Sequence, residues 1–294
     1  MAHVLKNAQL EIQIDLPFEN YNFSRFDWTG KIVSVKYKNI FVSGVEILND
    51  KDDTRSGKGF YNEFGIDAAL GFAETKTGDW FHKIGVGLLK KDSEDYLISR
   101  KYAILPAEFN VSVKQDEMII SCISPAFNGY SYSFKKEIRL VESGFIIKYY
   151  LENTGEKTIN TDEYNHNFIA INKELMGRDY QLKFLFYLKP EQFGETVNPE
   201  GKVEIGEKEI TFNSTPNEPF FFSNLSGNEN IEAAWVLINT KNKIGISETG
   251  SFNTTKVNLW GWKHVISPEL FFAITVEPGK KIEWSRTYHV FEIN

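Results

Sequence analysis

The sequence contains almost no cysteine and no cluster of basic residues. Cys122 is the single cysteine among 294 residues, which excludes an intramolecular disulfide and a cysteine-based zinc site. The net charge is −7, and the sequence has no basic tract. Nucleic-acid binding needs clustered Lys and Arg, so it is not expected. No run of about 18 apolar residues occurs, and the opening MAHVLKNAQLEIQIDL lacks the apolar core of a signal peptide. We therefore expect a cytoplasmic protein that makes no membrane contact.

Motifs of several large enzyme classes are also missing. The chain has no GxSxG, no HExxH, no P-loop, and no GxGxxG following a strand. The histidines are too dispersed for their spacing to indicate a metal site; they are His3, His82, His166, His264 and His289. We expect neither a metal nor a cofactor.

Alternating apolar and polar residues dominate the rest of the sequence. Aromatic residues make up 15% of the chain, which favours pleated sheet. Runs of strand-like alternation are separated by turn residues such as Asn-Gly, Thr-Gly and Pro-Gly. They include segments 9–16, 31–42, 118–124, 145–155, 202–212, 233–247 and 270–291. The best helical candidate, EFGIDAAL at 63–70, is short. We predict an all-β protein, a large antiparallel β-sandwich formed by residues 1–294 as one domain.

One segment departs from this pattern. Residues 47–82 are rich in glycine and polar residues but also contain Phe60, Phe64 and Trp80 among several aromatics. Long glycine-rich loops are commonly functional or disordered, and disordered segments are poor in aromatics. We therefore predict an ordered loop that covers a site.

The stretch DEYNHNFIAIN, at 162–172, places a polar cluster where a strand is expected to begin. Asn165, His166 and Asn167 precede the strand-forming residues 168–171. Asn is depleted in strands, so these side chains need hydrogen-bond partners or solvent. Such a cluster indicates that this end of the strand opens into a concave site.

The order of four stretches resembles the galactose mutarotase (aldose 1-epimerase) superfamily, and within it a bacterial branch of unassigned substrate. They are SRFDWTGKIVSVKYKN (24–39), an opening hairpin; GDWFHKIGVGLL (78–89), a strand after the glycine-rich loop; NTGEKTINTDEYNHNFIAIN (153–172), the asparagine-histidine strand; and VEPGKKIEWSRTYHVF (276–291), a closing hairpin. The resemblance implies a β-supersandwich and a role in carbohydrate metabolism. It also implies acid–base interconversion of the α and β anomers of a free sugar.

The same resemblance implies a catalytic pair. His166 would protonate the ring oxygen, since histidine titrates near neutral pH. The family's base is a glutamate, but KVNLWGW at 256–262 contains no acid, so Glu269 in ISPELFF is the candidate base. The alternatives are a structural buried histidine and a surface or hydrogen-bonded glutamate.

Further residues are candidates for holding sugar hydroxyls or for stacking on the sugar ring. They are Arg55, Glu63, His82, Lys83, Asn165, Asn167, Trp260 and Trp262. Each has a structural alternative: Arg55 and Glu63 could pair with each other, Lys83 could be an ordinary edge lysine, and both tryptophans could pack in the core. Strand alternation would also point Asn165 and Asn167 away from His166.

We therefore expect a cofactor-independent isomerase, resembling aldose 1-epimerase, that acts on a free aldose or sugar derivative. The alternative is a non-catalytic sugar-binding protein on the same fold. A third interpretation is a module related to the sandwich domains of polysaccharide-processing enzymes. We do not favour it, because we expect neither a second domain nor a secretion signal in this sequence. We expect a small-molecule sugar as the partner, and a monomer or homodimer.

Overall fold

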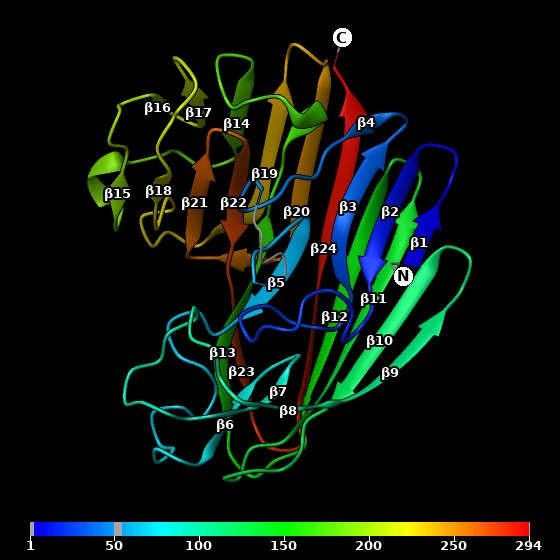
Figure 1. Cartoon of the computed structure of the whole chain (residues 1–294). Coiled ribbons are helices and arrows are strands. Elements are labelled where there is room, and N and C mark those ends of the chain that lie inside the picture. The colour runs from blue at the N-terminus through cyan, green and yellow to red at the C-terminus, as the bar shows by residue number, and fades with distance from the viewer. Residues whose placement is uncertain (1–2, 50–54, 294) are drawn as a thin grey trace.

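The computed structural model describes residues 3–49 and 55–293, and two large antiparallel sheets dominate it (Figure 1). The strand pairs are antiparallel throughout the ladders of this described part, and the only helical elements there are two short 3₁₀ turns. The prediction of an all-β antiparallel sandwich is therefore confirmed. Within the same residues, no helix is both long and apolar enough to cross a membrane.

The first sheet holds the asparagine-histidine strand. Its strands, in spatial order, are β1 (His3–Lys6), β2 (Leu10–Asp15), β3 (Lys31–Tyr37), β5 (Phe60–Phe64), β13 (Ile159–Asn167) and β23 (Phe272–Val276), with β4 (Ile40–Phe41) paired to β3. The strand β13 thus lies between β5 and the edge strand β23.

The second sheet has ten strands. In spatial order they are β16 (Val203–Ile205), β17 (Glu209–Phe212), β14 (Tyr180–Phe184), β19 (Ile231–Asn239), β20 (Ile244–Thr254), β24 (Lys281–Glu292), β12 (Gly144–Asn153), β11 (Tyr132–Val141), β10 (Glu117–Ile123) and β9 (Glu108–Val113).

Two small sheets flank these layers. One contains β15 (Thr196–Val197), β18 (Phe220–Phe222), β21 (Val257–Trp262) and β22 (Val265–Leu270); the other contains β6 (Trp80–Lys83), β7 (Gly87–Lys90) and β8 (Ile104–Pro106). The 3₁₀ turns are η1 (Ile171–Lys173) and η2 (Pro190–Gln192). Figure 1 shows β21 and β22 above the end of β13, and β6 to β8 below it.

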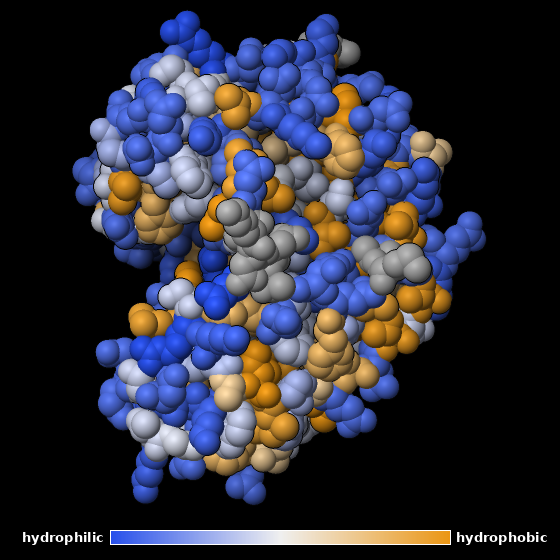
Figure 2. Space-filling view, in the orientation of Figure 1, coloured by the Kyte–Doolittle hydropathy of each residue, from blue (hydrophilic) through white to orange (hydrophobic). Residues whose placement is uncertain are grey.

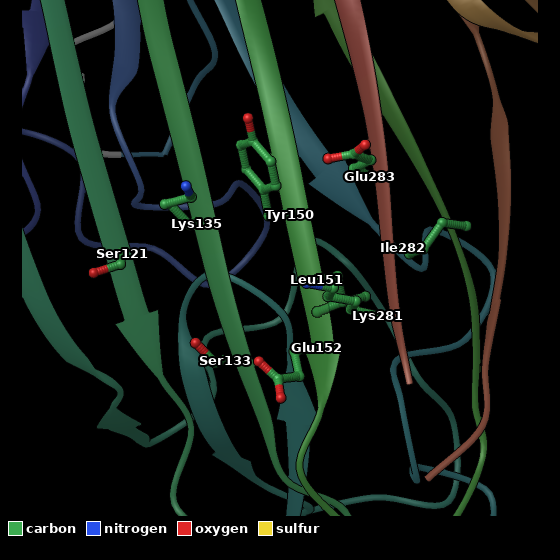
Figure 3. A pocket seen from close by; sticks show the side chains of 9 residues that line it. All are labelled: Ser121, Ser133, Lys135, Tyr150, Leu151, Glu152, Lys281, Ile282 and Glu283. Atoms are coloured by element: carbon green, nitrogen blue, oxygen red, sulfur yellow. The ribbon is translucent and has the colours of Figure 1, made fainter. Parts of the chain in front are cut away.

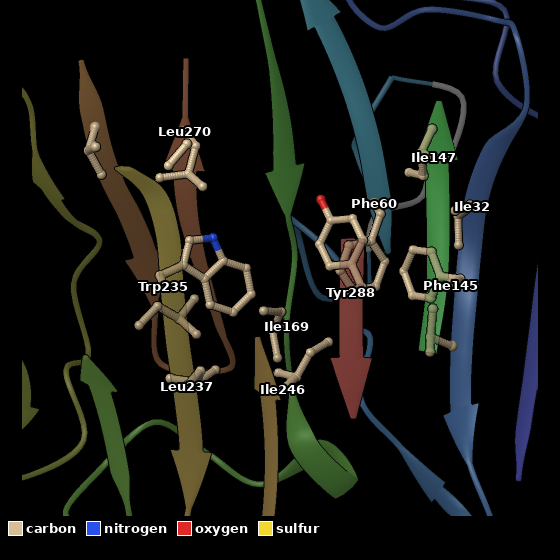
Figure 4. Close-up of a cluster of buried hydrophobic side chains, with 14 of the residues drawn as sticks. Ile32, Phe60, Phe145, Ile147, Ile169, Trp235, Leu237, Ile246, Leu270 and Tyr288 are labelled. Carbon is tan, nitrogen blue, oxygen red and sulfur yellow. The ribbon is translucent and has the colours of Figure 1, made fainter. Parts of the chain in front are cut away.

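The core lies between the two large sheets. Phe60 of the first sheet packs edge-on against Phe145 and Tyr288 of the second, with ring centroids 5.3 and 4.9 Å away (Figure 4). Phe145 and Tyr288 stack at 4.6 Å. All three are buried, and burial of each large apolar side chain contributes about 1.5–3 kcal/mol. The alternation read from the sequence supplies Phe145 and Tyr288, whereas Phe60 comes from the segment 47–82 that departs from it.

Two of the alternating runs form strands as predicted, and each folds back on itself as a hairpin. The segment 31–42 forms the hairpin of β3 and β4, and its turn residue Lys38 adopts a positive φ of 51°. The segment 202–212 forms the hairpin of β16 and β17. Turn residues at these points allow the chain to reverse direction within one sheet.

Four local predictions are wrong. EFGIDAAL is not helical: it contains the end of β5, and Gly65 has a φ of +59° and donates its N–H to the Asp162 carbonyl (3.0 Å). Segment 78–89 is a hairpin of β6 and β7, not one strand. Segment 276–291 is not a hairpin, because β23 pairs with β13 whereas β24 pairs with β12 and β20 in the opposite sheet. The polar cluster ends β13 instead of beginning a strand.

The surface carries several hollows, and two of them differ in character. Figure 2 shows an indentation between the part of the molecule containing β21 and β22 and the part containing β6 to β8. The other hollow, of about 600 Å³, lies on the solvent face of the ten-stranded sheet (Figure 3). There Lys135 lies 3.8 Å from the Tyr150 ring and forms an ion pair with Glu137 (2.7 Å). The first contact joins β11 to β12 and the second lies within β11, and both are typical of a solvated sheet face.

Candidate active site

The two faces of β13 place its side chains in different surroundings. Because successive strand residues point to opposite faces, Tyr164 and His166 share one face, and Glu163, Asn165 and Asn167 share the other. The second group points into the sandwich, where all three are 0% exposed. The first group faces outward, towards β22 and the loops around β5. His166 is therefore separated from its two asparagine neighbours.

Both ring nitrogens of His166 contact a carboxylate. Nε2 lies 2.9 Å from Oε2 of Glu63 on β5, and Nδ1 lies 2.9 Å from Oε1 of Glu269 on β22. An imidazole can donate from both nitrogens only when it is protonated. The structure thus brings together the two residues that the resemblance implies as acid and base, and places His166 in the charged form between two acceptors.

The electrostatic balance around His166 favours its charged form. Burial alone lowers the pKa of His166, but the charge and hydrogen bond of Glu269 and the hydrogen bond of Glu63 outweigh this, so the pKa is raised above 6.5. Arg25, whose Nη2 lies 3.4 Å from Nε2, opposes the increase. His166 therefore stays protonated at a higher pH than an ordinary histidine.

Glu63 is fully buried and acts as an acceptor for several donors. Its Oε2 accepts hydrogen bonds from Tyr164 Oη (2.9 Å) and Arg25 Nε (3.2 Å) as well as from His166. Burial opposes ionisation, but Arg25 and Lys83 outweigh it and hold the pKa of Glu63 well below its usual range. Glu63 is thus a permanent carboxylate beneath His166. It does not line the pocket, so it is not placed for direct contact with a sugar.

Arg25 is a site residue that the sequence analysis did not single out. Its Nη1 forms an ion pair with Glu46 Oε1 (2.8 Å), and its guanidinium lies 4.5 Å from the centre of the Phe26 ring. Glu46 also accepts the backbone N–H of Gly57 (2.7 Å), which ties the glycine-rich segment to the site. Arg25 lies in SRFDWTG, a stretch noted for its hairpin but not for its charge. Its carboxylate partners come from other elements, so no local pattern marks it.

A pocket of about 170 Å³ opens onto His166 and Glu269. The residues that line it are Arg25, Glu46, Ile66, Tyr164, His166, Phe168, Phe221, Asn258, Trp260 and Glu269. Ile66, Phe168, Phe221 and Trp260 supply apolar surface, and the other six side chains are polar. Ile66 belongs to the 47–82 segment predicted to cover a site, of which residues 50–54 lie outside the described part. A small pocket with a few polar groups and aromatic walls is typical of a small-molecule site.

Charges at this site balance when His166 is protonated. The carboxylates of Glu46, Glu63 and Glu269 are matched by Arg25, Lys83 and His166. Arg25 and Lys83 are already engaged by carboxylates. The pocket therefore offers no surplus positive charge to an anionic ligand.

The two asparagines do not reach the pocket. Asn165 donates to Tyr288 Oη (2.7 Å), and Asn167 donates to Glu248 (2.9 Å) and to the Pro268 carbonyl (2.6 Å). Strand alternation, which the sequence analysis had noted, decides this placement. Both are structural residues of the sandwich interior and not sugar contacts.

His82 and Lys83 are also placed away from the pocket. The ring of His82 contacts Ser124 Oγ (2.8 Å) and the Phe127 carbonyl (3.3 Å), and burial lowers its pKa to about 4. Lys83 is 1% exposed and donates to the Phe64 carbonyl (2.6 Å) and Tyr96 Oη (3.0 Å). Lys83 affects the site only through Glu63, which lies 3.6 Å away.

The remaining candidates divide between the pocket and its surroundings. Trp260 lines the pocket and packs edge-on against Phe168, with centroids 6.1 Å apart. Trp262 follows on the same side of β21, as its spacing predicted, but its indole N–H is bound by the Asn217 carbonyl (2.6 Å) and it does not line the pocket. Arg55 is exposed, lies 5.4 Å from the Phe23 ring, and does not line the pocket either.

The arrangement of acids does not suit a metal ion. Glu63 and Glu269 contact opposite nitrogens of His166, so these three residues cannot converge on one ion. Across residues 3–49 and 55–293, no group of three or more His, Cys, Asp or Glu side chains is arranged to hold a metal. The chemistry available here is proton transfer between a charged imidazole and a carboxylate.

Comparison with known proteins identifies the fold. No family model and no curated protein matches the sequence. Solved structures do match over nearly the full length. The Slr1438 protein from Synechocystis has 10% identity and a TM-score of 0.61, covering 99% of this chain and 96% of its own. A galactose mutarotase-like protein from Lactobacillus casei has 13% identity and a TM-score of 0.60, covering 99% and 100%.

The GalM/aldose epimerase homologue from C. elegans is also similar, with 13% identity, a TM-score of 0.55 and full coverage of both chains. At these identities the similarity assigns the fold alone. The chain thus has the galactose mutarotase-like fold expected from its four sequence stretches.

Proposed function

We propose that this protein is a carbohydrate isomerase of the aldose 1-epimerase type, which interconverts the α and β anomers of a free, uncharged aldose. One observation carries the proposal. A protonated His166 and the Glu269 carboxylate, with Nδ1 and Oε1 2.9 Å apart, meet at the wall of a small pocket beside aromatic side chains. Ring opening of a cyclic sugar needs this combination of one acid and one base at adjacent oxygens.

The reaction follows from these two groups. Glu269 takes the proton of the anomeric hydroxyl while His166 gives its Nδ1 proton to the ring oxygen. The bond between C1 and the ring oxygen breaks, and C1 becomes an aldehyde carbon. After rotation about the C1–C2 bond, the ring hydroxyl attacks the other face of the carbonyl, and both protons return. Atoms and charge balance, and no cofactor takes part.

Other residues of the site support the proton transfer. Glu63 keeps Nε2 of His166 occupied, so the proton that leaves the ring is the one on Nδ1. Arg25 and Asn258 line the pocket and are suited to hold sugar hydroxyls. Trp260 and Phe168 offer apolar surface to the C–H face of a sugar. Because no cation is in surplus, a phosphorylated sugar is disfavoured.

A non-catalytic sugar-binding protein is the second candidate. It is favoured by the direct contact of His166 with Glu269, since a sugar must separate the acid from the base before it can react. The catalytic reading is favoured by the presence of a carboxylate in the pocket, which a protein that had lost its base would lack. Turnover decides between them.

The test measures anomer exchange by NMR on a panel of free aldoses. Wild type should accelerate exchange of at least one neutral aldose, and Glu269→Gln and His166→Ala should each lose roughly 10²–10⁴-fold in rate. If only His166→Ala loses activity, the protein is still an isomerase but Glu269 is not its base. Saturable sugar binding without acceleration by wild type would contradict the isomerase and leave the sugar-binding protein.

A further inference from the structure

The strand β22 is held against β13 by polar contacts centred on Asn167. The two strands belong to different sheets, and an isolated backbone bridge joins Ile169, just after the end of β13, to Ile266 of β22. Beyond it, the Asn167 side chain donates to the Pro268 carbonyl (2.6 Å), and the Asn167 backbone N–H donates to Ser267 Oγ (3.0 Å). The residue next to His166 therefore fixes the residues just before Glu269.

Ser267 extends this connection to the Glu269 carboxylate. Its hydroxyl accepts from Asn167 N–H and donates to Glu269 Oε1 (3.2 Å), the oxygen that contacts His166 Nδ1. Ser267 is 0% exposed, so water does not compete for its hydroxyl. A closed set of contacts thus runs from the backbone beside His166, through Ser267 and Glu269, back to the imidazole.

We propose that Ser267 is a positioning residue that fixes the orientation of the Glu269 carboxylate, with Oε1 on the side of His166 Nδ1. This inference rests on the proposed function for its kinetic consequence, but not for its geometry. A glutamate carboxylate turns readily about its last torsion, so a fixed donor is needed to keep one oxygen in place. Ser267 is suited to this because its own orientation is set by the Asn167 N–H.

The structural test uses the Nδ1 proton of His166 in the sugar-free protein. A charge-assisted hydrogen bond to a carboxylate, sheltered from water, should give a downfield ¹H resonance at acidic to neutral pH. In Ser267→Ala we expect this resonance to move upfield or to be lost through exchange with water. Glu269→Gln gives the reference for a contact without a carboxylate. An unchanged resonance in Ser267→Ala, or none in wild type, would overturn the positioning role.

The kinetic test uses the same variant on any aldose that wild type accelerates. We expect Ser267→Ala to lower kcat roughly tenfold and to leave KM within about twofold, because the lost contact acts on the reacting groups and not on sugar binding. Ser267→Thr keeps the hydroxyl and should restore most of kcat. Ser121→Ala, on the solvent face of β10, is the matched control and should behave as wild type.

The two proposals fail in different ways. If the downfield resonance depends on Ser267 but no aldose is turned over, the positioning role stands and the isomerase does not. If aldoses are turned over and Ser267→Ala changes neither the resonance nor kcat, the isomerase stands and the positioning role is wrong. A rise of KM in Ser267→Ala with unchanged kcat would also contradict the positioning role.

Discussion

Both faces of β13 carry buried polar side chains that take part in ion-pair networks, but the two networks differ. On the interior face, Glu163 pairs with Arg286 (2.8 Å), and Arg286 also pairs with Glu248. Asn165 and Asn167 complete the same network through Tyr288. On the pocket face, His166 holds two carboxylates but borders a cavity.

This difference separates a structural cluster from a chemical one. In the interior, the cation is a guanidinium, which does not lose its proton at accessible pH. In the pocket, the guanidinium of Arg25 is accompanied by the imidazolium of His166, whose proton can leave. What distinguishes the pocket face is a cation that can lose its proton, at a position that a ligand can reach.

The largest effect should come from breaking the interior network. Arg286→Met leaves Glu163 and Glu248 buried without their cation, which should cost about 3–5 kcal/mol in the free energy of unfolding. Urea denaturation measures the loss. His166→Gln should change stability much less while abolishing anomer exchange. If both variants lose the same free energy of unfolding, the contrast between the faces is wrong.

The next largest effect concerns two buried histidines whose pKa values are shifted in opposite directions. Burial lowers the pKa of His82 to about 4, whereas the carboxylates raise that of His166 above 6.5. His82 therefore favours folding above pH 6.5, and this contribution is lost as the pH falls towards about 4. His166 contributes fully below pH 6.5, and its contribution is lost as the pH rises through its raised pKa.

Side-chain NMR titration of both rings checks these directions. Stability curves against pH add a second readout: His82→Gln should flatten the acid side of the curve, and His166→Gln the neutral-to-alkaline side. Titration of the two rings at similar pH would contradict the opposite environments.

A smaller effect separates Asn165 from the sugar. Asn165→Ala removes the hydrogen bond to Tyr288 and should lower the free energy of unfolding by about 1–3 kcal/mol. KM for any accelerated aldose should stay within twofold, because Asn165 faces the interior. A selective rise of KM with unchanged stability would place Asn165 in the pocket after all.

The smallest effect should come from the pocket wall. Trp260→Phe keeps an aromatic face but shortens it, and should raise KM a few-fold with little change in kcat, since the contact is present throughout the reaction. Trp262→Phe is the matched control on the same strand, and should leave KM unchanged. If the two variants change KM equally, the contrast between Trp260 and Trp262 is wrong, and both residues serve the same role.

Much of the fold could be predicted because it rests on local pattern. The alternation of β2, β3, β10 and β12 is visible in the sequence, as are the hairpin turns of 31–42 and 202–212. Long-range pairing was not visible. The Pro-Gly turn after β23 looks like a hairpin turn, yet it carries the chain from one sheet to the other.

The site shows the same division. His166 and Glu269 were predicted and lie in contact, but the sequence could not show that Glu63 would be buried beneath the ring, or that Arg25 would join it. These contacts join β5, β13, β22 and the loop before β3, which no local spacing relates. Ser267 was missed for the same reason.

The sequence by itself determined that this chain forms antiparallel strands, that the alternating residues of β13 face opposite sides, and that His166 stands apart from its neighbours. Side-chain periodicity in a strand is a local property, so neighbouring residues suffice to read it. Only the tertiary structure decided which side opens to a ligand and which carboxylates meet the imidazole. Both features depend on how the four sheets pack against one another. The distances between His166 and its carboxylate partners are set only by that packing.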